Sequence, residues 1–586
     1  MRERQIGFSG AAAAVFLFTA LPLWAQMTGL GRVPQKAKPL PPGLKPPKVH
    51  YEDIAAAAGL TGVNVSGSDV QQAYIVENTG TGVAIFDFDN DGLLDIFFVN
   101  ADRFNRGEGE KITHFLYHNQ GGLRFEDVTA ASGIAHEGWG QGVCAGDIDN
   151  DGYIDLYIGY WGQNALYRNQ GDGTFRNETA ERGLGTPGRR WGAGCAFLDY
   201  DRDGWLDLFV AHYLEFDPAK VPAPGEPGGC RWKGFPVVCG PMGLPPETMS
   251  LYRNEGGGRF RNVTEEAGIA TARAAGLTVL TADFDNDGWV DVYVTGDSTP
   301  SLLFHNLGNG KFEEMGEFLG VAYNEDGHEQ SGMGTHAADY NRDGLLDIVK
   351  TNFTDDIPNL YENYGDGSFV EVTAAAGLAI HTQFVGWGVA FLDFDHDGWK
   401  DIFIANGHVY PDIDARNVGQ TFRQPRLLYW NRRDGEFYDM SRQAGPGILA
   451  RHSSRGVALG DLDNDGVLEI VVVNMHEAPS LLKHSGSRGN SILIQALTAS
   501  GRDAVGARLT LRTGDGVQID EVRSGGYYQS QGDFRVHFGL GDAGSADLAI
   551  RWPDGAEESF PALPAGHWVV IRQGEGVVGK KPFAAN

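Results

Sequence analysis

Seven short acidic segments contain the residues of this sequence whose types and spacing could do chemistry. Each segment follows the pattern D-x-D-x-D-G-x-x-D with small variations. Calcium takes about six to eight oxygen ligands, and carboxylates at alternating positions of a tight loop can converge on one ion. The Gly at the sixth position permits the sharp turn, the seventh residue offers its backbone carbonyl, and the ninth closes the site. We therefore expect a structural calcium ion in each of the seven segments.

The expected ligands are the residues at positions one, three, five, seven and nine of every segment. They are Asp87, Asp89, Asp91, Leu93, Asp95, Asp147, Asp149, Asp151, Tyr153, Asp155, Asp199, Asp201, Asp203, Trp205, Asp207, Asp283, Asp285, Asp287, Trp289, Asp291, Asp339, Asn341, Asp343, Leu345, Asp347, Asp393, Asp395, Asp397, Trp399, Asp401, Asp461, Asp463, Asp465, Val467 and Glu469.

Two segments depart from the pattern. Asn341 removes a carboxylate from the fifth segment, so we expect weaker calcium binding there, and Glu469 in the seventh has to reach further. Of the 28 side-chain positions, 27 are acidic, and without them the net charge of −30 would be −3. The acidity therefore gives no indication of a cationic partner, and no basic surface points to nucleic acid.

Two other interpretations of the acidic segments are EF-hands and metal-free turns. An EF-hand begins in the same way but needs a glutamate at its twelfth position, between two helices. Here the twelfth positions are apolar, as at Phe98, Ile158 and Val210, and they lie in strand-like runs, which excludes EF-hands. Solvated turns without metal are less consistent with seven loops in register, because uncompensated clusters of four carboxylates repel one another strongly.

The acidic segments lie between short apolar runs, such as GVAIFD and IFFVN, which predicts strand–loop–strand units. An aromatic-x-Asn mark follows most loops, and an aromatic strand comes next, near Phe125 in the first copy. A seventh aromatic strand precedes the first loop, around Tyr51. We therefore predict an all-β chain with a seven-bladed β-propeller over residues 49–486, in which the N-terminal strand completes the last blade. Residues 214–250 and 408–426 are insertions.

The C-terminal part has no acidic loop of the repeat type. Short alternating runs, such as SILIQAL and ADLAIRW, are broken by Gly, Asp and Pro turns. We therefore predict a small β-sandwich over residues 487–575, followed by a tail over 576–586.

The N-terminus has the features of an export signal. Arg2 and Arg4 supply positive charge, and an apolar run ends at the small residue Ala25. We predict a cleaved signal peptide over 1–25, a proline-rich linker over 26–48, and a secreted, periplasmic or cell-surface location. An uncleaved anchor over residues 6–25 is the alternative, and no other segment could span a membrane.

The four cysteines fall into two groups. Cys230 and Cys239 lie in a Pro/Gly-rich insertion, where an oxidising compartment would favour a disulfide. Cys144 and Cys195 lie in apolar strand-like runs, and we expect them to be small buried residues.

The acidic repeats resemble the FG-GAP/VCBS repeats of integrin α-subunit propellers, over about residues 50–484. The segments AVGARLTLRTGDGVQIDEVRSGGYYQSQ and RVHFGLGDAGSADLAIRWPDG resemble an ASPIC/UnbV domain. Together they resemble the cartilage acidic protein family, which implies extracellular calcium binding and adhesion-like roles without a settled activity. The loop CRWKGFPVVCGPMGL also resembles that family, which supports a Cys230–Cys239 pair.

The sequence contains no catalytic constellation that stands out from the calcium loops. The segments that enter the inner strands carry polar and aromatic residues, which would gather at one mouth of a propeller channel and suit a saccharide or a peptide. The candidates are Trp139, Arg190, Trp191, His328, Glu329, Trp387 and Arg455. The alternative is that the tryptophans pack between blades and the histidines are solvated.

These observations predict an exported calcium-binding scaffold for an unknown protein or glycan partner, and not an enzyme. A polysaccharide lyase or hydrolase on a propeller body is one alternative. A structural subunit of an envelope complex is another.

Overall fold

The computed structural model describes residues 32–135, 137–185 and 188–584. The expected signal peptide over 1–25 and the first part of the linker lie outside these residues. Residues 32–48 contain no helix or strand, but they lie along the propeller, where the Arg32 N–H donates to the Asp355 carbonyl (3.0 Å) and the Gln35 N–H to that of Ala379 (2.8 Å). Within the described residues, no helix is both long and apolar enough to cross a membrane.

The described residues form seven antiparallel units of four strands, each with an acidic loop between its first and second strands. In chain order the units are β2 (Val83–Phe86), β3 (Asp95–Phe98), β4 (Phe115–Asn119) and β5 (Phe125–Asp127); β6 (Gly140–Gly146), β7 (Asp155–Gly162), β8 (Ala165–Asn169) and β9 (Phe175–Asn177); β10 (Arg190–Leu198), β11 (Asp207–His212), β14 (Ser250–Asn254) and β15 (Phe260–Asn262); β16 (Gly276–Ala282), β17 (Asp291–Gly296), β18 (Leu302–Asn306) and β19 (Phe312–Glu314); β20 (Gly332–Ala338), β21 (Asp347–Asn352), β22 (Asn359–Asn363) and β23 (Phe369–Glu371); β24 (Gly386–Leu392), β25 (Asp401–Asn406), β27 (Leu427–Asn431) and β28 (Phe437–Asp439); and β30 (Ser454–Gly460), β31 (Glu469–Asn474), β32 (Ser480–His484) and β1 (Tyr51–Asp53).

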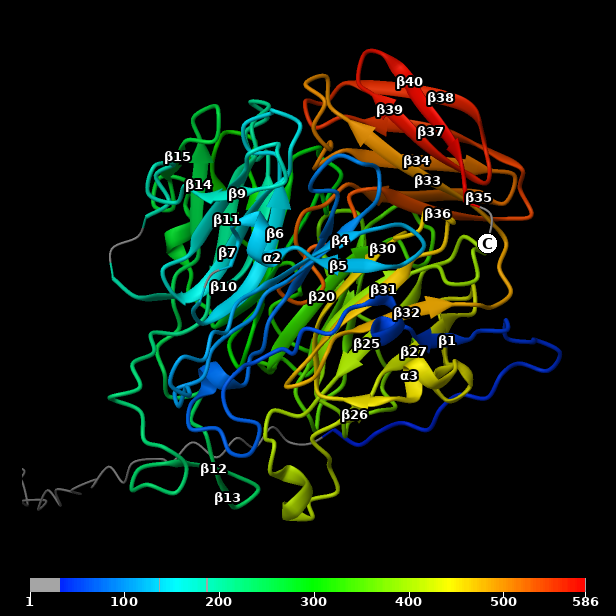
Figure 1. Ribbon diagram of the computed structural model, residues 1–586. Coiled ribbons are helices and arrows are strands. Elements are labelled where there is room, and N and C mark those ends of the chain that lie inside the picture. Colours follow the sequence, from blue (N-terminus) through cyan, green and yellow to red (C-terminus); the bar gives the residue numbers. More distant parts are fainter. Residues whose placement is uncertain (1–31, 136, 186–187, 585–586) are drawn as a thin grey trace, which may run out of the picture.

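These units are the blades of a closed β-propeller (Figure 1). Their first strands contact one another in the cyclic order β2, β6, β10, β16, β20, β24, β30 and back to β2. Strand β1 pairs with β32, with Tyr51 opposite His484, so the N-terminal strand completes the last blade as the sequence predicted. Blades two and three are also joined through β10 and β7, where Trp191 lies opposite Trp161.

Short helical turns and small strand pairs lie in the connections within and between the blades. They are α1 (Ala55–Ala58), α2 (Thr129–Ser132), α3 (Pro446–Leu449), η1 (Ile75–Glu77), η2 (Ile269–Thr271), η3 (Ile413–Arg416), η4 (Ser441–Gln443), the hairpin β12 (Cys230–Trp232) with β13 (Phe235–Val237), and β26 (Gln424–Pro425) with β29 (Arg451–His452).

The C-terminal domain is a sandwich of two four-stranded sheets, with strand orders β36-β33-β39-β40 and β35-β34-β37-β38. Its strands are β33 (Asn490–Leu497), β34 (Arg508–Thr513), β35 (Gly516–Glu521), β36 (Val536–Gly541), β37 (Ser545–Arg551), β38 (Glu557–Pro564), β39 (His567–Arg572) and β40 (Gly576–Pro582). The expected tail over 576–586 is therefore wrong for residues 576–582, which pair with β39 as an edge strand. Their alternation was too short and polar to stand out in the sequence.

The loop between β35 and β36 enters the central channel of the propeller and plugs it. Tyr527, Tyr528 and Gln531 in this loop are all buried. The backbone bonds of this loop to the first strands of five blades are Gln531 N–H to Val83 O (2.9 Å), Val143 N–H to Gln529 O (3.0 Å), Gly526 N–H to Val279 O (2.8 Å), Thr335 N–H to Tyr527 O (2.8 Å) and Asp533 N–H to Leu459 O (2.9 Å). Tyr528 also packs edge-on against Trp387 on β24 (ring centroids 5.0 Å).

The two insertions cover the opposite end of the channel, away from the sandwich (Figure 1). Trp232 of the first insertion packs against His408 and Tyr410 of the second, with ring centroids 5.5 and 5.9 Å apart. Lys233 Nζ lies 2.8 Å from Asp355 Oδ2 in blade five. The predicted Cys230–Cys239 disulfide is present and joins β12 to the segment after β13.

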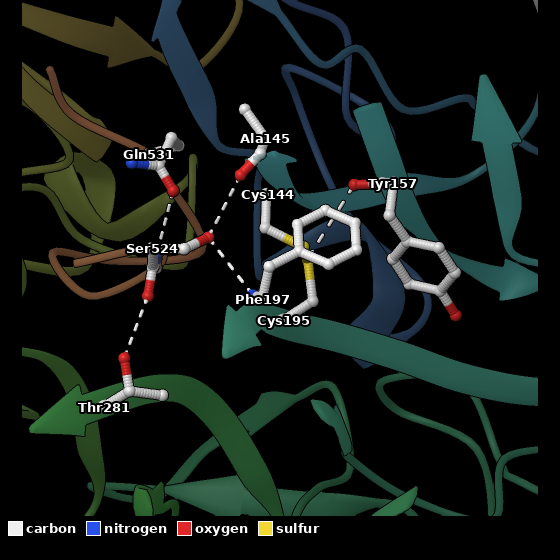
Figure 2. The surroundings of a disulfide bond; sticks show 9 residues. Cys144, Ala145, Tyr157, Cys195, Phe197, Thr281, Ser524 and Gln531 are labelled. Atoms are coloured by element: carbon white, nitrogen blue, oxygen red, sulfur yellow. Dashed lines mark hydrogen bonds between the residues drawn. A yellow bond between two sulfur atoms is a disulfide. The ribbon is translucent and has the colours of Figure 1, made fainter. Parts of the chain in front are cut away.

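Cys144 and Cys195 are buried, as expected, but they are not two separate small residues. They form a second disulfide between β6 and β10, with Cα atoms 5.7 Å apart, and this corrects the expectation (Figure 2). Blades two and three place these strands side by side, a proximity that a separation of 51 positions in the sequence concealed. Ser524 of the plug lies beside the bridge: its Oγ accepts from the Phe197 N–H (3.1 Å) and donates to the Ala145 carbonyl (3.2 Å).

Candidate metal centres

The backbone of every acidic loop turns at its fourth and sixth residues, both of which have positive φ. In the first loop these are Asn90 (φ 62°) and Gly92 (φ 89°), and the same two positions are left-handed in all seven loops. Asn tolerates this conformation and Gly adopts it without strain, which explains the Asn-Asp-Gly sequence found in four of the loops.

Hydrogen bonds within each loop hold the first and fifth carboxylates. The sixth-position Gly N–H donates to the first carboxylate, as from Gly92 to Asp87 Oδ2 (2.8 Å), and this bond recurs in every loop at 2.8–3.1 Å. The seventh-position N–H donates to the fifth carboxylate, as from Leu93 to Asp91 Oδ1 (2.8 Å). The loop therefore orients its carboxylates before any ion is bound.

The ninth-position carboxylate is the most deeply buried member of each group. Asp95 Oδ2 accepts from the Phe88 N–H (3.1 Å) and its Oδ1 from the Asn119 N–H (2.8 Å). Burial, together with the neighbouring Asp89 and Asp87, raises the pKa of Asp95 to about 9. Burial likewise raises the pKa of the ninth carboxyl in the other loops, to about 7 in Asp291. Without a cation, these groups are costly to ionise.

Several loop carboxylates have a buried oxygen that has no hydrogen-bond partner among the described residues. They are Asp149 Oδ1, Asp201 Oδ1, Asp283 Oδ1, Asp395 Oδ1, Asp463 Oδ1 and Glu469 Oε1. In the first two loops, the oxygens of positions one, three and nine lie within 4.8 Å of one another. Converging, unsatisfied carboxylate oxygens are the donor set that a hard divalent cation such as calcium requires. The residues therefore fit the metal that the sequence predicted.

The loops are bonded to one another around the ring, which the sequence did not reveal. The fourth-position Asn90 Nδ2 donates to the Gly152 carbonyl of the next loop (2.9 Å), and Asn464 Nδ2 donates to the Gly92 carbonyl (3.1 Å). Arg202 contacts the Gly288 carbonyl in the same way. An ion that fixes one loop therefore also fixes its neighbours.

The sandwich lies over the acidic loops, which are called metal loops from here on, and several of its arginines contact them. Arg551 pairs with Asp283, the first residue of the fourth loop. Arg502 Nη2 lies 3.6 Å from Asp199 Oδ2, and Arg535 Nη2 donates to the Asp461 carbonyl (2.7 Å). These arginines are far from the loops in sequence, and no repeat marks them, so only the fold identifies them.

The seven residues predicted to form a ligand surface do not meet at one open site. Trp191, Trp387 and Arg455 are buried beneath the insertions, and the Arg455 guanidinium lies 3.9 Å from the Trp387 ring centroid. Arg190 Nε lies 2.6 Å from Glu247 Oε2 at the side of blade three. The other three are placed apart: Trp139 is partly exposed, and His328 and Glu329 are exposed in the loop before β20. The insertions and the plug bury three of these residues, which therefore belong to the core and do not line an open mouth.

Comparison with known families agrees with this architecture. An FG-GAP-like repeat model matches residues 87–158, 147–210, 237–294, 283–350 and 418–472, and an ASPIC and UnbV model matches residues 497–578. The chain therefore belongs to the FG-GAP-like repeat family and ends in an ASPIC and UnbV domain. This confirms the propeller class and the family that the motifs implied.

The chain is similar to cartilage acidic protein 1. It is 25% identical to the Mus musculus protein over 503 residues, which cover 81% of this chain and 70% of that one. Identity to the Homo sapiens protein is 24% over 499 residues, covering 81% of this chain and 69% of that one. It is also 27% identical over 163 residues to integrin alpha-3 of Cricetulus griseus, which covers 25% of this chain and 16% of the integrin.

Proposed function

We propose that the chain is an exported, calcium-stabilised propeller that acts as an adhesion-type scaffold for a protein or glycan partner. The observation that carries the calcium part is the set of buried loop oxygens, such as Asp149 Oδ1 and Asp463 Oδ1, that have no hydrogen-bond partner within the part of the chain that the structure describes. Removing such groups from water is costly unless a cation binds them. The similarity to cartilage acidic protein 1 and to part of an integrin α-subunit supports the scaffold role.

Calcium has a structural role in this proposal. If each loop binds at about 0.1 mM and calcium is about 1 mM, each site stabilises the folded chain by about 1.4 kcal/mol. Seven independent sites would give about 10 kcal/mol, which is comparable to the stability of a whole domain. The bonds between loops, such as Asn90 to Gly152, would spread this effect around the ring.

The proposed partner surface is the end of the propeller that carries the insertions. The sandwich covers the other end, and the plug fills the channel, so a large partner has access to this end. The Cys230–Cys239 disulfide constrains the β12–β13 hairpin there, and Met242 beside it is 39% exposed. A constrained, partly apolar loop loses little entropy when it binds.

Metal analysis and calorimetry test the calcium part. After equilibration with calcium and removal of free ions, the chain should retain about seven equivalents, and EDTA should lower the melting temperature by about 10 °C or more. Far fewer equivalents together with an unchanged melting temperature would falsify the proposal.

Binding to a panel of extracellular proteins and glycans tests the scaffold part. Met242→Glu adds a charge to the exposed residue beside the disulfide, and it should abolish a calcium-dependent signal while the melting temperature changes by less than about 2 °C. Incubation with a polysaccharide panel provides the opposite test, because new unsaturated or reducing ends would identify an enzyme instead.

A further inference from the structure

The third strand of each blade places one side chain beside the metal loop of the same blade. This residue is the middle one of the aromatic-x-Asn mark. In blade three, Arg253 Nε lies 2.7 Å from Asp201 Oδ2 and its Nη2 lies 3.0 Å from Asp203 Oδ2. In blade two, Arg168 makes the same two contacts, at 2.7 Å and 2.5 Å. Each arginine neutralises part of its loop.

Three other blades have a basic or titratable side chain at this position. Lys483 Nζ lies 2.6 Å from Asp463 Oδ2, and His305 Nδ1 lies 3.1 Å from Asp291 Oδ1. His118 Nε2 lies 3.1 Å from Asp89 Oδ2. In blade six, where Trp430 occupies the position, Arg433 Nε reaches Asp397 Oδ2 (2.7 Å) from three residues further on. In six of the seven blades, a nitrogen atom of an arginine, lysine or histidine side chain therefore lies beside the acidic loop.

Blade five is the exception, because Glu362 occupies this position. Among the described residues, no ion pair joins Glu362, Asp339, Asp343 or Asp347 to a basic side chain. The Tyr340 hydroxyl donates to Glu362 Oε2 (2.7 Å), and this bond holds the carboxylate next to the second residue of the loop. The side chain of His118 has a similar length and reaches its loop from the equivalent position. Glu362 therefore occupies the position from which a nitrogen-bearing side chain approaches the acidic loop in blades one, two, three, four and seven.

The same blade carries Asn341, which is the amide in place of a loop carboxylate. Asn341 Nδ2 donates to Asp343 Oδ2 (2.9 Å), so the amide takes over part of the role that arginines have in blades two and three. Loop five has three carboxylates of its own and a fourth from Glu362. Loop three has four carboxylates, but Arg253 is paired with two of them.

Loops three and five share two other features. Each has an arginine at its fourth position, Arg202 and Arg342. Each also receives an arginine of the sandwich on its sixth-position carbonyl: Arg502 Nη2 to Gly204 O (3.4 Å) and Arg508 Nη2 to Gly344 O (2.9 Å). They differ in that Arg502 also lies 3.6 Å from the Asp199 carboxylate of loop three, whereas Arg508 pairs with Glu521 of the sandwich. Loop three therefore faces more positive charge than loop five, from Arg502 as well as from Arg253.

We propose that Glu362 belongs to the fifth metal centre and replaces the negative charge that Asn341 removes. This inference rests on the proposed calcium binding and reverses the expectation, drawn from Asn341 alone, that the fifth centre is the weak one. A divalent cation at loop five faces a carboxylate where a cation at loop three faces a guanidinium, and Coulomb's law favours loop five. The fifth centre therefore retains calcium at concentrations at which the third centre has released it.

Hydrogen exchange measured by mass spectrometry can follow each loop separately in the full chain. The amides of residues 340–349 and 200–209 are monitored while free calcium is varied. The protection midpoint of loop five should lie at a lower calcium concentration than that of loop three. Glu362→Gln keeps an acceptor for Tyr340 but removes the charge, and it should raise the loop-five midpoint about tenfold without moving loop three.

Two further variants separate charge from structure. Tyr340→Phe removes the hydrogen bond to Glu362 and leaves the charge, so the loop-five midpoint should change less than it does in Glu362→Gln. Glu108→Gln removes an exposed glutamate from a loop at the other end of blade one and should leave both midpoints unchanged.

The inference is overturned if Glu362→Gln leaves the loop-five midpoint in place, or if Tyr340→Phe moves it equally. It is also overturned if loop five of the native chain needs as much calcium as loop three, or more. If no loop gains protection from calcium, the proposed calcium function fails first, and that result is distinct from a silent Glu362 variant in a chain whose other loops respond.

Discussion

Asn119 Nδ2 lies 2.8 Å from the carbonyl oxygen of Leu462, a residue 343 positions later in the chain. Asn119 is in blade one and Leu462 is in the metal loop of blade seven, so this hydrogen bond closes the ring. The same Nδ2 also donates to the Leu94 carbonyl in its own loop (2.8 Å). Asn169 repeats the arrangement by donating to the Phe88 carbonyl of blade one (2.8 Å). The asparagines of the aromatic-x-Asn mark therefore link consecutive metal loops.

Replacement of Asn119 by alanine should weaken the ring closure. The carbonyls of Leu94 and Leu462 would lose their donor in a buried site. We expect a loss of about 2–4 kcal/mol in the free energy of unfolding, measured by urea denaturation in calcium. Asn309→Ala, an exposed asparagine in a turn, is the control and should change stability by less than about 0.5 kcal/mol. Equal effects of the two variants would show that the hydrogen bonds of Asn119 contribute nothing to the free energy of unfolding.

The sequence predicted the blades and the loop ligands because the repeat makes these features visible seven times. It did not predict what the repeated asparagine bonds to, since the partner lies in the preceding blade. The seventh blade lacks the asparagine, and His484 stands in its place, with both ring nitrogens buried and unpartnered among the described residues. In this blade the third strand, β32, pairs with the N-terminal strand β1 and leads into the sandwich. The repeated asparagine is therefore absent from the blade that closes the ring.

The Cys144–Cys195 disulfide should stabilise the chain more than the Cys230–Cys239 disulfide does. Loop-closure entropy grows with the length of chain that a bridge closes, and the two bridges join cysteines 51 and 9 positions apart. We expect the double variant Cys144→Ala/Cys195→Ala to lose about 4 kcal/mol and Cys230→Ala/Cys239→Ala about 2.5 kcal/mol. Urea unfolding of the two variants under the same oxidising conditions measures both. The reverse order would mean that strain or residual structure outweighs the entropy of the unfolded chain.

Gly82 lies at the contact between the plug and the propeller, so a substitution there tests this contact. A Cβ atom on this residue would lie 1.7 Å from the carbonyl oxygen of Gln529, so Gly82→Ala should force the plug outward. We expect a loss of about 1–3 kcal/mol and faster proteolysis between β32 and β33, measured by urea unfolding and by timed digestion.

Gly514→Ala is the matched control for Gly82→Ala. Gly514 lies in the turn between β34 and β35, and a Cβ there would meet no described atom within 4 Å. This variant should digest at the native rate. A Gly82→Ala chain that remains equally resistant would show that the sandwich docks without the plug.

The predicted ligand surface shows the limit of sequence reasoning most clearly. Trp191 and Trp387 are aromatic residues near a channel mouth, and the sequence cannot distinguish a lining residue from one that an insertion covers. The insertions were visible as long intervals between repeats. The sequence did not show where the insertions pack, because contacts such as that of Trp232 with His408 join two segments that share no repeat pattern. The plug was hidden for the same reason, since its residues resemble a turn within the sandwich.

Asp520 links the sandwich to the propeller, and its ionisation should make this docking sensitive to acid. Lys400 Nζ of the sixth metal loop lies 3.0 Å from Asp520 Oδ2, and Arg523 Nη2 lies 2.6 Å from Asp520 Oδ1. Burial alone would raise the pKa of Asp520, but Lys400 and Arg523 outweigh it and lower the pKa to about 2. Because the folded-state pKa is below the unfolded value of about 3.8, the contribution is fully present above about pH 4 and is lost as the pH falls through about 2.

Asp520→Asn should therefore remove a pH-dependent stabilisation of about 2 kcal/mol and leave Lys400 and Arg523 without their shared partner. The measurement is urea unfolding of the native chain and the variant in the same buffers between pH 5 and pH 2, so that any loss of calcium affects both and cancels in the difference. The difference in free energy between the native chain and the variant should shrink as the pH falls through that range. Asp542→Asn, an exposed aspartate of the sandwich, should give a constant difference near zero. A constant, nonzero difference for Asp520→Asn would assign Asp520 a packing role in place of an electrostatic one.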